Sequence, residues 1–281
     1  MFGDYLYGIE ILELPTPMAH FTSEIAITDK VPQWREASNV ECDPLQLYWF
    51  RWITGHQTMF MLWHILTKEL AHMESTGVDA ERLALTTKIL NACGVLYEYS
   101  GSCSVKYYHQ YVRPLMTLTH RAFSGYWALD YSDIPRLTRC VLLRTGLSAN
   151  VEKKQKAFKQ SYLRGQKIHI NVAKKLVPEN VSLLKLAKNN GMAIEQVQPH
   201  HYKIYDAFFL VNRTNMSPLQ FQQSLYRRLD AIVDDLTTCP PSNQVKQVSV
   251  ETLVTVKDSI RELFKIRPKA PSQDLTLHKL S

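Results

Sequence analysis

The segment from Asp43 to about Gly77 constrains the fold of this chain more than any other. Asp43-Pro44 is a strong helix start, because aspartate caps backbone N–H groups and proline suits the first helical position. About 30 residues without a proline follow. Large side chains recur there at spacings of three and four, which places them on one broad helix face: Trp49, Trp52, His56, Met59, Phe60 and Trp63. The sequence therefore predicts one long helix with an aromatic face toward the core.

Further helices are predicted along the rest of the chain, and together they indicate an all-α, single-domain helical bundle. Helical patterns cover residues 79–99, 105–112 (before Pro114), 134–145, 151–175, 181–189, 199–212, 218–237 and 250–264. Residues 120–133 lack clean periodicity and are predicted as a structured loop. We expect residues 1–42 to form a proline-broken N-terminal arm, residues 43–266 the helical domain, and residues 267–281 a loose tail.

Composition narrows the class of protein. Glycine is only 10 of 281 residues, and no G-x-G-x-x-G or G-x-x-x-x-G-K-[ST] string occurs, which disfavours turn-rich β folds and phosphate-binding loops. The five cysteines are an odd number without a C-x-x-C pair, which disfavours a disulfide framework and a zinc knuckle. Scattered thiols, an N-terminus without a basic signal segment, and no apolar run of membrane length predict a cytoplasmic protein with no membrane partner.

His56 is the first candidate for chemistry, and two interpretations of it stay open. Its place among indoles on an interior helix face is typical of a core histidine with one hydrogen bond. A buried imidazole beside large aromatic rings also suits the wall of a flat pocket, where it can exchange a proton with a substrate. The neighbouring Gly55 costs about 1 kcal/mol against alanine inside a helix, so we expect something to approach the backbone there.

The pair His200-His201 is the second candidate. Neutral imidazole is a usual ligand of haem iron, and adjacent helical residues point about 100° apart, so only one of the pair could serve. No Glu-x-x-His pair occurs, which disfavours a carboxylate-bridged di-iron site.

Residues 152–175 form a basic stretch with eight Lys or Arg and a single acid, within a net charge of +7. Such a cluster can neutralise phosphates. Its interleaved aromatic residues are limited to Phe158 and Tyr162, so a platform for stacking bases is poorly supported. We interpret the stretch as a solvated helix face and expect no nucleic-acid partner.

Two regions of the sequence resemble a known superfamily. Tyr48–Met73 is similar to one helix of the tryptophan 2,3-dioxygenase superfamily. The residues of this chain that match the pattern of that helix are His56-Gln57-Thr58, Trp63 and Glu69-Leu70. The strings at residues 100–103 (SGSC) and 123–131 (FSGYWALDY) resemble the bacterial haem-dependent tyrosine hydroxylases of the same superfamily. The resemblance implies a tryptophan 2,3-dioxygenase-like helical bundle that encloses a haem.

The resemblance also implies a cofactor and its ligand. It implies non-covalent haem b, because the His-x-x-x-Cys pattern of the covalently attached variant has tyrosine at position 205. His201, with Asp206 five residues on, fits the axial-ligand pattern, and His200 is the alternate.

On the opposite side of the haem, the resemblance implies His56 as the catalytic residue. The substrate-binding residues would be Trp52, Arg113, Arg121, Ser124 and Trp127. Tyr108 stands where the dioxygenases have their carboxylate-binding arginine, and Arg113, Arg121 and Arg136 stay open as substitutes.

The implied activity is hydroxylation of L-tyrosine at the ring 3-position to 3,4-dihydroxyphenylalanine, driven by hydrogen peroxide or dioxygen, in natural-product biosynthesis. Ring cleavage of tryptophan is disfavoured, because NRTNMSP replaces the glycine-rich loop of the dioxygenases. Two alternatives stay open: a related haem oxygenase acting on tryptophan or a substituted tyrosine, and a non-catalytic haem-binding protein. Members of the superfamily are commonly oligomeric, so a homo-oligomer is a further open possibility.

Overall fold

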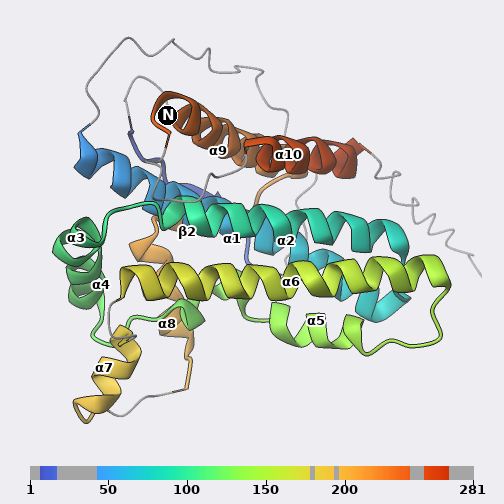
Figure 1. Cartoon of the computed structure of the whole chain (residues 1–281), viewed down its shortest axis with the longest axis horizontal. Coiled ribbons are helices and arrows are strands. Elements are labelled where there is room, and N and C mark those ends of the chain that lie inside the picture. Colours follow the sequence, from blue (N-terminus) through green and yellow to red (C-terminus); the bar gives the residue numbers. More distant parts are fainter. Residues whose placement is uncertain (1–6, 18–42, 178–180, 193–195, 241–249, 266–281) are drawn as a thin grey trace, which may run out of the picture.

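A computed structural model describes residues 7–17, 43–177, 181–192, 196–240 and 250–265 (Figure 1). Most of the predicted arm and all of the predicted tail lie outside these residues. The helices are α1 (Pro44–Thr76), α2 (Ala80–Ser100), α3 (Val105–Tyr107), α4 (Arg113–Thr119), α5 (Ile134–Leu142), α6 (Ala149–Leu176), α7 (Leu183–Asn189), α8 (Pro199–Phe208), α9 (Pro218–Thr238) and α10 (Val250–Lys265). The described part of the chain is therefore mostly helical, as predicted.

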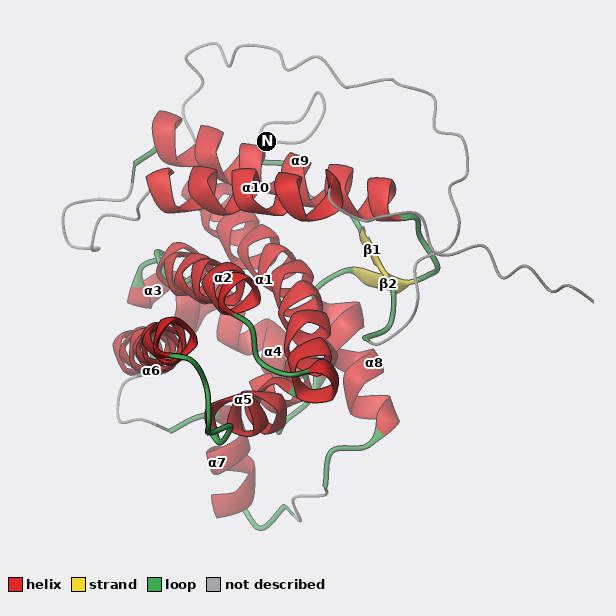
Figure 2. Cartoon of the chain, turned by 90° about the vertical axis from the view of Figure 1, so that its right-hand side faces the viewer, coloured by secondary structure: helices red, strands yellow, loops and turns green. Residues whose placement is uncertain are grey.

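Helix α1 begins where the sequence predicts. The Asp43 side chain accepts a hydrogen bond from the Leu45 N–H at 3.0 Å, and Pro44 opens the helix. From Phe50 onward α1 is buried on nearly every side, because it packs against α2, α5 and α9. Figure 2 shows it running through the middle of the molecule. The aromatic face predicted from the sequence is thus one side of a helix that is enclosed all round.

At Gly55 the end of α2 comes close to the backbone of α1. A Cβ atom at this position would lie 2.1 Å from Ser100 Oγ and 3.1 Å from the Tyr99 ring. The backbone of α1 is thus approached by the end of α2, which explains why a glycine interrupts a long helix.

Two short strands depart from the all-α prediction. β1 (Leu12–Leu14) pairs in parallel with β2 (Val211–Arg213), and Leu12 and Leu14 are fully buried. The prediction of a helix over residues 199–212 is therefore wrong at its end: α8 stops at Phe208, and Leu210 takes a positive φ of 54° before β2 begins. A left-handed residue ends helical hydrogen bonding and lets the chain extend.

The segment around Pro114 is also more helical than predicted. A π-helical turn (Tyr108–Val112) follows α3, and α4 then passes through Pro114 to Thr119. The Arg113 N–H bonds to the Tyr108 carbonyl across this widened turn, and Pro114 lies at the start of α4, where a missing N–H is tolerated. Residues 120–133 are the predicted structured loop, with 3₁₀ turns at Gly125–Trp127 and Leu129–Tyr131.

None of the described helices has the length and apolar character needed to cross a bilayer.

Candidate functional site

His56 lies in α1 with its ring orientation fixed by its own helix. Its Nδ1 is 2.5 Å from the Trp52 carbonyl oxygen, which can only accept, so Nδ1 carries the proton and Nε2 keeps a lone pair. Burial lowers the pKa of His56 to about 4, only partly offset by the Trp52 contact. The imidazole is therefore neutral near pH 7 and presents an acceptor.

Aromatic rings surround His56. Phe209, just after α8, stacks on the imidazole at 4.5 Å between ring centroids, and the Trp52 ring lies 4.6 Å away. Trp52 also contacts Tyr108, the first residue of the π-helical turn, at 5.8 Å. Helix periodicity explains the pairing of Trp52 with His56, whereas Phe209 and Tyr108 reach this position only through the fold.

His201 is buried at the start of α8, and its Nδ1 accepts a hydrogen bond, whereas Nδ1 of His56 donates one. The backbone N–H of Gln198 donates to Nδ1 at 2.9 Å, as it would to the glutamate of a capping box. A neutral imidazole that accepts at Nδ1 carries its proton on Nε2. Trp127 stacks on the ring at 4.4 Å, and the exposed His200 ring lies 4.0 Å from it.

A continuous series of rings connects the two histidines. From His201 it passes through Trp127, then Phe123 at 5.8 Å, then Phe209 at 6.4 Å, which stacks on His56. The fold thus brings the two predicted histidines to opposite ends of one aromatic cluster, together with Trp52 and Trp127.

The other predicted substrate-binding residues differ in placement. Arg113 is half-buried and donates to the Val181 carbonyl at 2.9 Å. Burial raises the pKa of Tyr108, and the nearby positive charge of Arg113 offsets part of this rise. Arg121 is exposed, and the Ser124 hydroxyl accepts from the Tyr126 N–H within a 3₁₀ turn. Arg136 pairs with Glu74 at the surface. Arg113 is thus the arginine that the described structure connects, through Tyr108 and Trp52, to His56.

Sequence reasoning did not anticipate the buried ion group next to α8. Arg213 in β2 donates to Asp206 at 2.7 and 2.9 Å and to Asp130 at 2.8 and 3.1 Å. Asp206, expected only as part of the ligand pattern, therefore fixes α8 to β2 and to the turn after Trp127. No periodic signal marks Arg213, because Asp130 lies 83 residues away and Asp206, seven residues away, belongs to a different element.

The chemistry of the two histidines suits a haem, but His201 would have to release its hydrogen bond to the Gln198 N–H before it could hold the iron. The residues have the right chemistry, because both imidazoles lie in aromatic surroundings. However, Nε2 of His201 carries a proton while its Nδ1 lone pair faces the Gln198 N–H, and Phe123 and Phe209 lie between the two histidines. Within the described ranges, no three His, Cys, Asp or Glu side chains gather as a metal-binding group.

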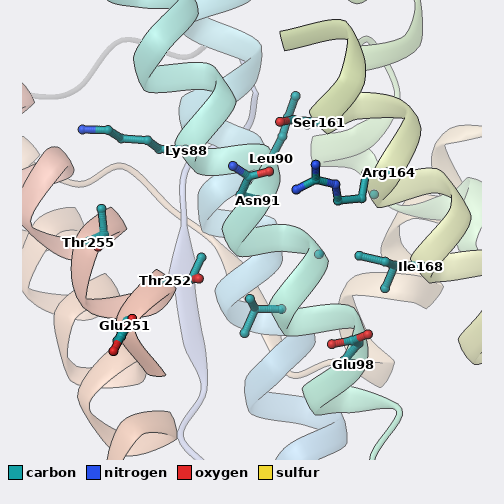
Figure 3. A pocket seen from close by; sticks show the side chains of 13 residues that line it. Lys88, Leu90, Asn91, Glu98, Ser161, Arg164, Ile168, Glu251, Thr252 and Thr255 are labelled. Carbon is teal, nitrogen blue, oxygen red and sulfur yellow. The ribbon is translucent and has the colours of Figure 1, made fainter. Parts of the chain in front are cut away.

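A cavity in the described part of the chain lies away from both histidines. Its volume is about 420 Å³, and it lies between α2, α6 and α10, lined among others by Asn91, Glu98, Arg164 and Thr252 (Figure 3). A second pocket of about 400 Å³ lies at the surface beside Arg113, His109 and Leu118. None of the predicted site residues except Arg113 lines either pocket.

Residues 15–142 match the protein family described as SfmD 3-methyl-L-tyrosine peroxygenase. The match covers less than half of the 281 residues, and it includes His56 and Arg113 but ends before α6 and His201. It supports the resemblance to tyrosine-modifying enzymes at the level of a peroxygenase family. No individual curated protein is significantly similar to the chain.

Proposed function

We propose that this protein is a peroxygenase that hydroxylates a tyrosine-type ring, with L-tyrosine converted to 3,4-dihydroxyphenylalanine and hydrogen peroxide as the oxidant. The observation that carries the proposal is the family match over residues 15–142, within which His56, Trp52 and Arg113 lie along one series of contacts. The printed family description favours 3-methyl-L-tyrosine as a second candidate substrate.

The proposed roles of the residues follow from their surroundings. His56 is the general base, because its neutral ring presents an Nε2 lone pair that can take a proton from a phenol. Arg113 binds the carboxylate of the amino acid, with Arg121 as the exposed alternative. Trp52, Trp127 and the Ser124 turn form the walls around the aromatic ring.

Haem b is the cofactor we propose, with His201 as the axial ligand and His200 as the alternate. When bound, haem supplies the oxygen chemistry, and the protein supplies binding and orientation. Binding through His201 Nε2 requires the ring to release the Gln198 N–H, because the metal-binding nitrogen must be free of its proton.

The proposal is tested by incubating purified protein, with its bound cofactor, with hydrogen peroxide and L-tyrosine, 3-methyl-L-tyrosine or L-tryptophan. Mass spectrometry should detect one added oxygen on the tyrosine-type substrates. Oxygenation of tryptophan alone would favour the related oxygenase, and a Soret band without any product would favour a haem-binding protein.

Three substitutions separate the proposed roles of the histidines. His56→Ala should keep the Soret band and slow turnover by about 10²–10⁴-fold, as expected for a lost general base. His201→Ala should lose the Soret band while His200→Ala keeps it. Full haem retention in His201→Ala would contradict the assignment of the ligand.

A further inference from the structure

The Trp52 indole N–H is a buried donor without an acceptor. The side chain is only 9% exposed, and Nε1 has no hydrogen-bond partner among the described residues. A buried polar group left unpaired costs about 1–3 kcal/mol, so such a group in a native structure calls for an explanation.

A complementary acceptor lies one helical turn away. Because Nδ1 of His56 donates to the Trp52 carbonyl, the lone pair of His56 is on Nε2. The two rings are 4.6 Å apart and share one face of α1. The same two residues therefore present one unmet N–H donor and one imidazole acceptor next to each other.

The rings around this pair offer little to satisfy it. Phe209 and Phe60 contact His56 through apolar edges and faces. Tyr108 contacts the Trp52 ring, but its hydroxyl makes no hydrogen bond to Trp52 Nε1. A ligand group that is donor and acceptor at once could pair with both residues.

We propose that Trp52 and His56 together recognise the hydroxyl group of a phenol: Trp52 Nε1–H donates to the phenol oxygen, and the phenol O–H donates to His56 Nε2. This inference rests on the proposed function and adds Trp52 as a residue that determines specificity. A hydroxyl is donor and acceptor at once, so it satisfies both groups. Phenylalanine satisfies neither, and the indole N–H of tryptophan satisfies only His56.

The expected selectivity is large, because the buried Trp52 N–H stays unpaired when the hydroxyl is missing. Isothermal titration calorimetry on the full-length protein with its cofactor should give L-tyrosine a dissociation constant about 100-fold or more below that of L-phenylalanine. Trp52→Phe should weaken L-tyrosine binding about tenfold and leave L-phenylalanine binding unchanged. Trp49→Phe is the matched control, because Trp49 is an indole one turn earlier that packs against Phe208 and should keep the full preference.

The outcomes distinguish this inference from the proposed function. If tyrosine and phenylalanine bind the unaltered protein equally, or if a folded Trp52→Phe variant keeps the full preference, the role of Trp52 is overturned while a tyrosine-type oxygenase stands. If no aromatic amino acid binds and no product forms, the proposed function falls and this inference with it. The comparison of ligands on the unaltered protein needs no variant to fold.

Discussion

His56 and His201 engage the same ring nitrogen, Nδ1, in opposite senses. His56 donates from Nδ1 to a carbonyl of its own helix, whereas His201 accepts at Nδ1 from the N–H that precedes α8. The first arrangement leaves an acceptor at Nε2 and the second leaves a donor. Two histidines in one aromatic cluster can therefore differ in which nitrogen donates and which accepts, because the backbone group that faces each ring selects its tautomer.

The helix segments that carry His56 and His201 are also stabilised by different kinds of contact. His56 lies in the enclosed middle of a 33-residue helix, which is fixed by close packing against α2. His201 lies in the first turn of a ten-residue helix, which is fixed by the ion group of Arg213 and by its cap. Packing should therefore dominate the stability around His56, and a few polar contacts should dominate it around His201.

The largest effect is expected from Arg213→Ala. The change leaves the carboxylates of Asp130 and Asp206 buried without their cation, which should lower the free energy of unfolding by about 3–5 kcal/mol. Urea denaturation measures it. Arg136→Ala is the control, because its pair with Glu74 is exposed and should contribute little to stability. Equal losses in both variants would contradict the importance of the buried group.

A smaller effect is expected from acid at His56. Its pKa of about 4 lies below the ordinary value of 6.5. Between these two pH values the imidazole is protonated in the unfolded chain and neutral in the folded chain. The stabilisation is complete above about pH 6.5 and is lost as the pH falls toward 4, by about 1–3 kcal/mol. His56→Phe does not titrate, so its urea midpoint should fall less between pH 7 and pH 4.5. An identical fall in both proteins would show that His56 is not held neutral.

Gly55→Ala tests the packing that holds the His56 region. The new Cβ meets Ser100 Oγ and the Tyr99 ring, and the resulting overpacking should cost about 1–2 kcal/mol despite the better helix propensity of alanine. Thermal unfolding measures it. Gly165→Ala is the matched control, because a Cβ there meets nothing within 4 Å in another long helix, and it should leave stability equal or higher. A stabilised Gly55→Ala variant would contradict the close approach of α2.

The smallest effect is expected from the cap at His201. His201→Ala should lower the free energy of unfolding by about 1 kcal/mol, because the Gln198 N–H loses its acceptor. His201→Gln should keep most of this stability, since glutamine is a favoured capping-box residue. Under the proposed ligation it should nevertheless bind haem no better than the alanine variant. If both variants were equally unstable, the cap contact would not explain the tautomer of His201.

Much of the helical architecture is predictable from local signals. Asp43-Pro44 and Ser217-Pro218 start α1 and α9 as expected, because a capping side chain and a proline act within one turn. The end of α8 and the passage of α4 through Pro114 were not predictable in this way. They depend on pairing with Leu12–Leu14 and on a π-helical turn, which no local pattern specifies.

The sequence by itself determined that Trp52 and His56 share a helix face, and it marked His56 and the pair His200-His201 as candidates, since helix spacing and residue type are local properties. Only the tertiary structure decided that Phe209 stacks on His56, that Trp127 stacks on His201, and that Arg113 rather than Arg121 reaches Tyr108. It also decided which nitrogen of each histidine bears the proton. These features arise from contacts between segments distant in sequence or from the exact backbone geometry around each ring, and neither follows from periodicity.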